Sequence, residues 1–215
     1  MKQMNWISVA LLWFGLNGVA LAQTDKAVGE NLAAQATMAL AAQPAGQNDG
    51  VLDAERERRA LQILLKSVEK KIVSAANAMP SDKYGFAPTD GEFKGVRTFG
   101  QQVKHLAATN YILAAAALGE APPADAGDEL GPEAVRTKAE ILDYLNGSFA
   151  QLGRAVDAIG DNKVPVKSSP ISPLSATVAT RFTLTVEALI HAFDHYGQMV
   201  EYLRMNGVVP PASRS

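Results

Sequence analysis

The sequence predicts an all-α protein that folds as a four-helix bundle. Four long segments repeat apolar residues at three- and four-residue intervals, the period of an amphipathic helix. Between them lie stretches rich in proline, glycine and aspartate, which are typical of loops. No segment carries a convincing strand signal. With 215 residues, 47% of them hydrophobic, the chain is long enough for one domain with a sizeable core.

The N-terminus resembles a secretory signal peptide over residues 1–22. Lys2 supplies a positive start, residues 7–16 form an apolar core, and Ala20-Leu21-Ala22 is a small-residue cleavage site. Cleavage would leave Gln23 first and export the protein to the periplasm or the extracellular space. An uncleaved anchor is the alternative, but polar residues interrupt this stretch and make it a poor membrane span. We therefore expect no stable membrane insertion after cleavage.

Residues 23–50 contain many alanines and no aromatic residue, so they offer little apolar surface to bury. We interpret them as a flexible linker, with a short extra helix over Glu30–Gln43 as the alternative. The folded domain is expected to span residues 51–215.

The first long helix of the domain is expected from Val51 to the turn at Pro80. Its charge run, residues 55–59, mixes both signs and indicates a solvated helix face. Its apolar positions follow the helical period: Leu61, Leu64, Leu65, Val68, Ile72, Ala75, Ala76 and Met79.

The second helix is expected to begin after Thr98. Thr98 and Gln101 have the spacing of a capping box, and Gly119 suits the C-terminal end of the helix. The third helix is expected to begin at Pro132 and to end before Gly160. It is strongly amphipathic and contains no histidine, so we assign it to scaffolding.

The last helix is expected to start at Ser172-Pro173 and to end at Asn206-Gly207. It carries two apolar lines on roughly opposite faces, and one of them passes through His191 and His195. We therefore expect both faces to be covered, one inside the bundle and the other by loops or a second subunit.

The protein has three histidines, and all lie on predicted helices. His191 and His195 are four residues apart, which places their side chains on one face about 6 Å apart along the axis. His105 lies on the second helix, so the three can converge inside the bundle. Neutral imidazole binds Zn²⁺, Ni²⁺, Fe²⁺ or Cu²⁺, and three protein ligands leave a coordination position free, as in catalytic zinc sites. Alternatively, each histidine is a core or edge residue bonded to a backbone carbonyl.

Three further side chains are candidates for this site. Glu187 precedes His191 by one turn and is a candidate fourth ligand, orienting partner or general base, or else a solvated carboxylate. Asp194 suits an orienting or surface role. Thr109, one turn after His105, is placed to hydrogen-bond into the site.

Several kinds of chemistry are excluded or disfavoured by composition. The chain has no cysteine, so it contains neither disulfides nor thiolate ligands. Its formal charge is −2 and no basic stripe is visible, which disfavours nucleic-acid binding. No nucleophilic serine motif or glycine-rich phosphate loop is present. If the protein is an enzyme, the metal must do the activating.

Three strings of residues resemble the DinB-like superfamily, and the resemblance covers about residues 52–213. The strings are Met79-Pro80-x-x-x-Tyr84-x-Phe86-x-Pro88, Val96-Arg97-Thr98-Phe99-Gly100-x-x-Val103-x-His105, and His191-x-x-Asp194-His195-Tyr196-Gly197-Gln198 with its continuation to Ser213. The resemblance implies an up-up-down-down bundle, homodimerisation, and a divalent metal, zinc or nickel, held by His105, His191 and His195.

Characterised members of the superfamily include metal-dependent transferases and isomerases that use low-molecular-weight thiols. The resemblance therefore implies a metal-dependent transferase or hydrolase acting on a small molecule, with a non-catalytic metal- or ligand-binding bundle as the alternative. The predicted export departs from the cytosolic thiol transferases, so it does not favour their thiol cosubstrate.

Overall fold

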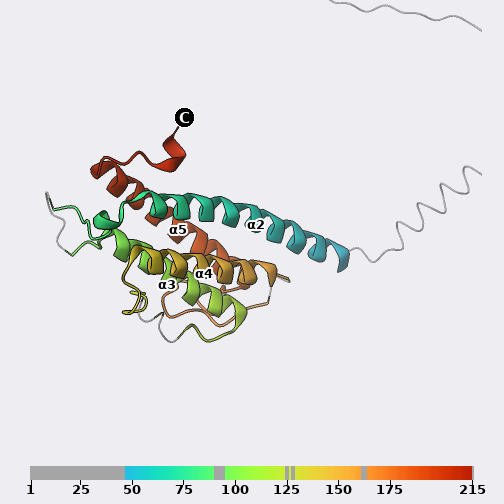
Figure 1. Cartoon of the computed structure of the whole chain (residues 1–215). Helices are drawn as coiled ribbons and strands as arrows, with labels where there is room; N and C mark the ends of the chain where they lie inside the picture. The colour runs from blue at the N-terminus through green and yellow to red at the C-terminus, as the bar shows by residue number, and fades with distance from the viewer. Residues whose placement is uncertain (1–46, 90–94, 124–125, 127–128, 161–163, 215) are drawn as a thin grey trace, which may run out of the picture. The chain divides into compact units, whose positions relative to one another are not determined.

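The computed structural model describes residues 47–89, 95–123, 126, 129–160 and 164–214. This part of the chain forms four α-helices, α2 Gln47–Ala78, α3 Phe99–Leu118, α4 Lys138–Asp157 and α5 Arg181–Met205 (Figure 1). Two short 3-10 helices, η1 Ser81–Lys83 and η2 Pro211–Ser213, complete it, and these residues include no strand. The predicted all-α bundle is confirmed.

The predicted signal peptide lies outside the described residues, as does most of the predicted linker. The linker's last residues, 47–50, already belong to α2, which begins at Gln47 rather than at Val51. Within the described part of the chain, no helix combines the length and apolar character needed to cross a bilayer.

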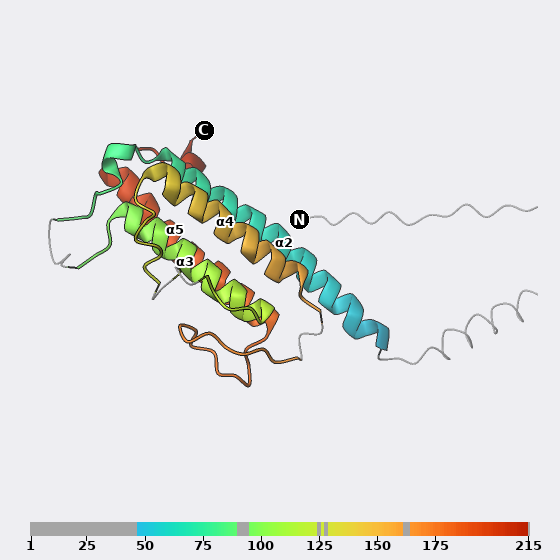
Figure 2. The ribbon, with the colours of Figure 1, turned by 60° about the horizontal axis from the view of Figure 1, so that its bottom comes forward.

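The helices do not follow the expected up-up-down-down order. In Figure 2, α2 and α5 run in one direction while α3 and α4 run in the other, which is an up-down-down-up order. The contacts agree. Lys138, at the start of α4, donates through Nζ to the carbonyls of Asn77 and Met79 at the end of α2, both at 2.8 Å. Gln62 of α2 donates to Asp157 at the end of α4, at 2.7 Å.

The connecting segments explain this order. The segment between α2 and α3 stays at one end of the bundle, because the Tyr84 hydroxyl donates to the Ala76 carbonyl at 2.7 Å and the Gly100 amide donates to the Tyr84 carbonyl at 2.8 Å. The segment between α3 and α4 instead returns along α3, where Lys104 Nζ donates to the Pro132 carbonyl at 3.0 Å. As a result, α4 starts again at the end where α3 started.

The capping box predicted at the start of α3 is confirmed. The Thr98 amide donates to Gln101 Oε1 at 2.8 Å, and the Gln101 amide donates to Thr98 Oγ1 at 3.2 Å. At the other end, Gly119 takes the left-handed conformation, with φ of 74°, that commonly ends a helix.

The last two helices begin later than predicted. Thr137 and Thr180 each form a capping box, so α4 starts at Lys138 and α5 at Arg181. Pro132 instead opens a turn, in which its carbonyl accepts from the Val135 amide at 3.2 Å. Proline and serine–proline signals are common in turns as well as at helix starts, and here the later threonine caps determine the boundaries.

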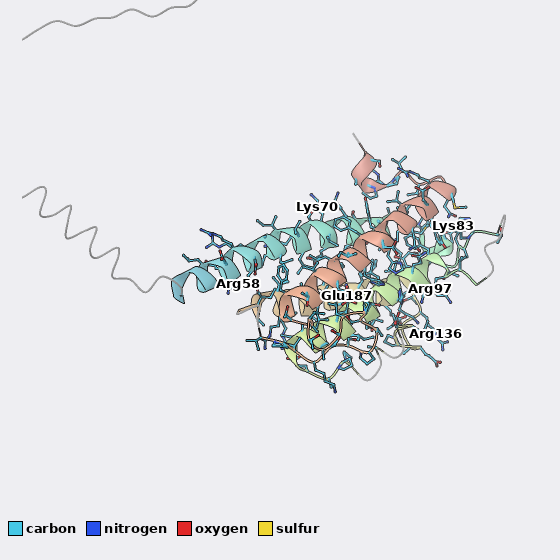
Figure 3. All side chains as sticks on the ribbon, turned by 180° about the vertical axis from the view of Figure 1, so that it is seen from behind. Arg58, Lys70, Lys83, Arg97, Arg136 and Glu187 are labelled. Atoms are coloured by element: carbon cyan, nitrogen blue, oxygen red, sulfur yellow. The ribbon has the colours of Figure 1, made fainter. Side chains whose placement is uncertain are left out.

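The core lies between the four helices, and α3 contributes the largest share of buried residues. Figure 3 views the bundle from the side of α5, which packs against both α2 and α3. The face of α5 that carries His195 is buried against α3. On the opposite face, Ile190 is 66% exposed and Phe193 is 46% exposed in the single chain, so loops cover this face only in part. Cover by a second subunit stays a prediction.

Candidate metal centre

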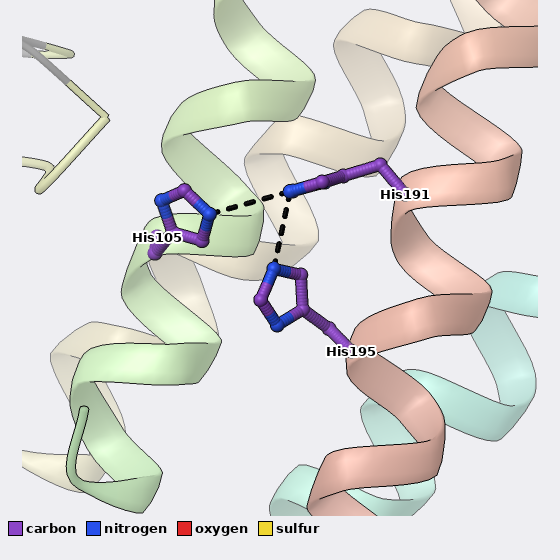
Figure 4. Close-up of side chains that lie close together, drawn as sticks. All are labelled: His105, His191 and His195. Atoms are coloured by element: carbon purple, nitrogen blue, oxygen red, sulfur yellow. Dashed lines mark hydrogen bonds between the residues drawn. The ribbon is translucent and has the colours of Figure 1, made fainter. Parts of the chain in front are cut away.

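The three histidines meet between α3 and α5 (Figure 4). His191 Nε2 lies 3.3 Å from His105 Nε2 and 3.1 Å from His195 Nε2. One ligand atom from each ring falls within 4.8 Å of the other two. His105 and His195 are buried, at 4% and 6% exposure, whereas His191 is only partly buried. The convergence predicted from the sequence is therefore present, and it is reached from α3 and α5 as expected.

The nitrogen separations fit a shared divalent ion. Zinc binds imidazole nitrogen at about 2.0–2.1 Å, which places two ligand nitrogens about 3.3 Å apart at a tetrahedral angle and about 3 Å apart at a right angle. The observed separations of 3.1 and 3.3 Å lie in this range. Histidine rings packed for apolar contact alone have no reason to point three Nε2 atoms at one place.

The far ring nitrogens of His105 and His195 are held by oxygen acceptors. His105 Nδ1 donates to the backbone carbonyl of Glu129 at 2.7 Å, and His195 Nδ1 donates to Gln102 Oε1 at 3.0 Å. A neutral imidazole carries one proton, so both Nε2 atoms present lone pairs. Such outer partners fix the tautomer and orientation of metal-binding histidines.

The Nε2 atoms have too few protons to satisfy one another. With Nε2 of His105 and His195 unprotonated, His191 Nε2 can donate to only one of them, and the remaining lone pairs face each other. A cation between the three rings would accept a lone pair from each Nε2 atom. The cluster is therefore better suited to hold a metal than to be a neutral hydrogen-bond network.

The carbonyl that holds His105 depends on an uncommon backbone conformation. Glu129 has φ of 73°, the left-handed region that non-glycine residues rarely adopt, and it is the only non-glycine residue with positive φ in the described part of the chain. Its carboxylate also lies 3.8 Å from His105 Nδ1. Backbone strain of this kind is often retained at functional sites.

All three imidazoles are neutral near pH 7. Burial lowers the pKa of His191 to about 3, and the neighbouring imidazoles add to the effect. Burial likewise lowers the pKa of His195 to about 4 and shifts the pKa of His105 downward. The charge of Arg97 contributes to all three shifts. Neutral imidazole is the form that binds metal, so protons do not compete for these nitrogens at physiological pH.

Glu187 does not join the group of ligand atoms. Its carboxylate oxygen Oε2 accepts a hydrogen bond from the Ser172 hydroxyl at 2.6 Å, and it lies on the face of α5 seen in Figure 3. There it borders an apolar cavity of about 390 Å³, which Leu174, Phe182 and Ile190 also line. Tertiary contact with the segment before α5, which the sequence could not indicate, directs the carboxylate away from the histidines.

The other two candidates also lie outside the ligand group. Asp194 accepts from the Gln198 side chain at 3.0 Å and is exposed, which is the surface role considered for it, although its charge raises the pKa of His191. Thr109 is buried, but among the described residues its hydroxyl has no hydrogen-bond partner, so it does not bond into the site.

Sequence reasoning missed three residues around the histidines: Gln102, Glu129 and Arg97. Gln102 carries a recognisable signal, because it is a polar residue in a mostly apolar helix and lies three positions before His105. Glu129 carries none, because a loop carbonyl can point anywhere until its backbone conformation is known. Arg97 belongs to one of the strings that resemble the superfamily, but no role followed from its position in the sequence.

The family model of the DinB superfamily matches residues 64–199, well over half of the chain. The matched span runs from the first half of α2 into α5 and includes all three histidines. No curated protein matches the chain.

Proposed function

Because the chain belongs to the DinB superfamily, we propose that it is a metal-dependent enzyme that transfers or hydrolyses a small substrate at a divalent ion held by His105, His191 and His195. The observation that carries this proposal is the convergence of three Nε2 atoms, two of them on rings whose other nitrogen is held by an oxygen acceptor. Zinc and nickel are the ions we favour, since imidazole suits both.

The protein's own contribution is to prepare the ligands. Glu129 and Gln102 hold a proton on Nδ1 of their histidines, which leaves Nε2 free and fixes the plane of each ring. Burial keeps the imidazoles neutral. When bound, a divalent ion would supply Lewis acidity, which lowers the pKa of water or of a substrate thiol.

The number of ligands favours an enzyme over a storage or structural site. Structural zinc sites are closed by four protein ligands, whereas catalytic sites use three. Among the described residues, the ligand group contains three histidines, and Glu187 is bonded to Ser172 instead. His191 is partly exposed, whereas the other two histidines are buried.

The test is a comparison of metal content and turnover in the purified protein. We expect about one divalent ion per chain by elemental analysis. We also expect turnover either in hydrolysis of an activated ester or in transfer of a small thiol to an electrophile, lost on chelation and restored by zinc or nickel. A metal-loaded protein inactive in both assays would favour a non-catalytic binding module. Negligible metal after growth and reconstitution would contradict the metal site itself.

We further propose that the protein is exported. The support is the charged start, apolar core and small-residue cleavage site in residues 1–22. We expect N-terminal sequencing of the protein recovered from the periplasm or medium of a bacterial host to begin at Gln23. An intact Met1 on protein found only in the cytoplasm would count against export.

A further inference from the structure

Arg97 occupies a fixed position immediately before α3. Its carbonyl accepts a hydrogen bond from the Tyr202 hydroxyl of α5 at 3.0 Å, so it bridges the two helices that carry the histidines. The next residue, Thr98, is locked in the capping box of α3. The base of the Arg97 side chain is therefore anchored, although the side chain itself is exposed.

Among the described residues, the Arg97 guanidinium makes no side-chain hydrogen bond and no ion pair, whereas Arg56, Arg59, Arg154 and Arg204 are each paired with a carboxylate. Arg97 borders a cavity of about 500 Å³ that is also lined by Gln101, Lys104, Leu130, Gly131 and Glu133. This cavity adjoins the segment whose residue Glu129 holds His105.

The charge of Arg97 acts on the histidine cluster. Burial is the larger cause, but this charge also lowers the pKa of each of the three imidazoles. In Figure 3, Arg97 lies on the α3 side of α5, on the same face of the molecule as Glu187. The link to the histidines runs through α3, because Gln101 in the wall of this cavity is followed by Gln102, which holds His195.

The cavity beside Arg97 carries more positive than negative charge. Arg97 and Lys104 line it with two cations, and Glu133 lines it with one carboxylate. A cavity lined in this way favours an anionic ligand.

We propose that Arg97 binds an oxyanion group, a carboxylate or a phosphate, of the small substrate whose reacting part lies at the three histidines. The planar guanidinium offers paired N–H donors that match two oxygens of such a group. This inference rests on the proposed function, because it assigns the substrate class of the same site. Arg97 thereby becomes a substrate-binding residue that determines specificity.

The experiment measures anion binding rather than turnover. Cobalt-loaded full-length protein is titrated separately with acetate and with inorganic phosphate, and binding is followed by calorimetry and by the visible spectrum of the ion. The variants are Arg97→Gln, which removes the charge, and Arg97→Lys, which keeps the charge but loses the paired N–H donors of the guanidinium. Arg136→Gln is the matched control, because it removes an equal charge from the same face and its side chain donates to the Glu133 carbonyl. Metal content and circular dichroism are recorded for each variant.

We expect Arg97→Gln to keep its metal and its helicity while binding the better of the two probes about tenfold more weakly, which corresponds to about 1.4 kcal/mol. Arg97→Lys should fall between this variant and the wild type, and Arg136→Gln should match the wild type. The tighter probe identifies the head group as carboxylate or phosphate.

Three results would overturn the inference while leaving the metal proposal intact: no binding of either probe to the metal-loaded wild type, equal binding by Arg97→Gln, or an equal loss in Arg136→Gln. A wild-type protein that takes up no metal would overturn both proposals.

Discussion

Replacing His191 with alanine is expected to abolish stoichiometric binding of a divalent metal. His191 Nε2 is the shared neighbour of the other two ligand nitrogens, at 3.3 Å from His105 and 3.1 Å from His195. Its loss leaves two nitrogens, so affinity should fall by more than the roughly 10–100-fold that removal of an outer hydrogen-bond partner costs. The measurement is metal content after dialysis, with affinity determined by competition against a chromophoric chelator.

A graded pair of variants separates loss of a ligand from general damage to the site. Gln102→Leu removes the acceptor of the His195 Nδ1 proton but keeps all three ligands, so its affinity should fall roughly 10–100-fold. Gln198→Ala removes an amide from α5 that, among the described residues, bonds only to Asp194, and it should retain wild-type affinity. Wild-type metal content in His191→Ala would refute the three-histidine site, and an equal loss in Gln198→Ala would indicate general damage to α5.

Replacing Phe149 with alanine is expected to lower the free energy of unfolding by about 3–5 kcal/mol, the usual cost of deleting a buried phenylalanine. Phe149 lies on α4, is 2% exposed and belongs to the core cluster. The cost combines lost transfer free energy with the cavity left between the helices. Urea unfolding followed by circular dichroism, with a chelator present so that metal does not contribute, gives the value.

Phe193→Ala is the matched control for this variant. Phe193 is also a phenylalanine in the middle of a long helix, but it is 46% exposed on the outer face of α5. Its replacement should cost well under half of the Phe149 value, because much of its side chain already contacts solvent. Similar losses for the two variants would show that the outer face of α5 is covered in solution, which contradicts the exposure described here.

The two phenylalanines illustrate what sequence periodicity can and cannot decide. Both fall on apolar lines at helical spacing, so the sequence predicts both as packed. Periodicity reports which residues share a face of one helix, but it does not say which face meets the other helices. On α5 the buried face is the one that carries His195, and the face of Phe193 is partly open.

The candidate site likewise has features that the sequence could predict and features that only packing decided. The His-x-x-x-His pair could be predicted from α5 alone, because a four-residue separation fixes one face of a helix whatever surrounds it. The convergence of His105 with this pair depends on the register of α3 against α5, so the sequence supplied it only as an expectation. Glu187 bonds to Ser172, which lies fifteen positions away in the chain. The pattern of residues around Glu187 therefore could not predict this partner.

By itself, then, the sequence determined the helical character of the domain, the capping box at Thr98 and the three candidate ligands. These follow from interactions within one or two turns of a helix, which the local sequence encodes. Only the tertiary structure decided the direction of the helices and the two oxygen atoms, on Glu129 and Gln102, that hold the imidazoles. Those features depend on how distant segments of the chain pack together, because a loop carbonyl or a side-chain amide meets its partner only in the folded protein.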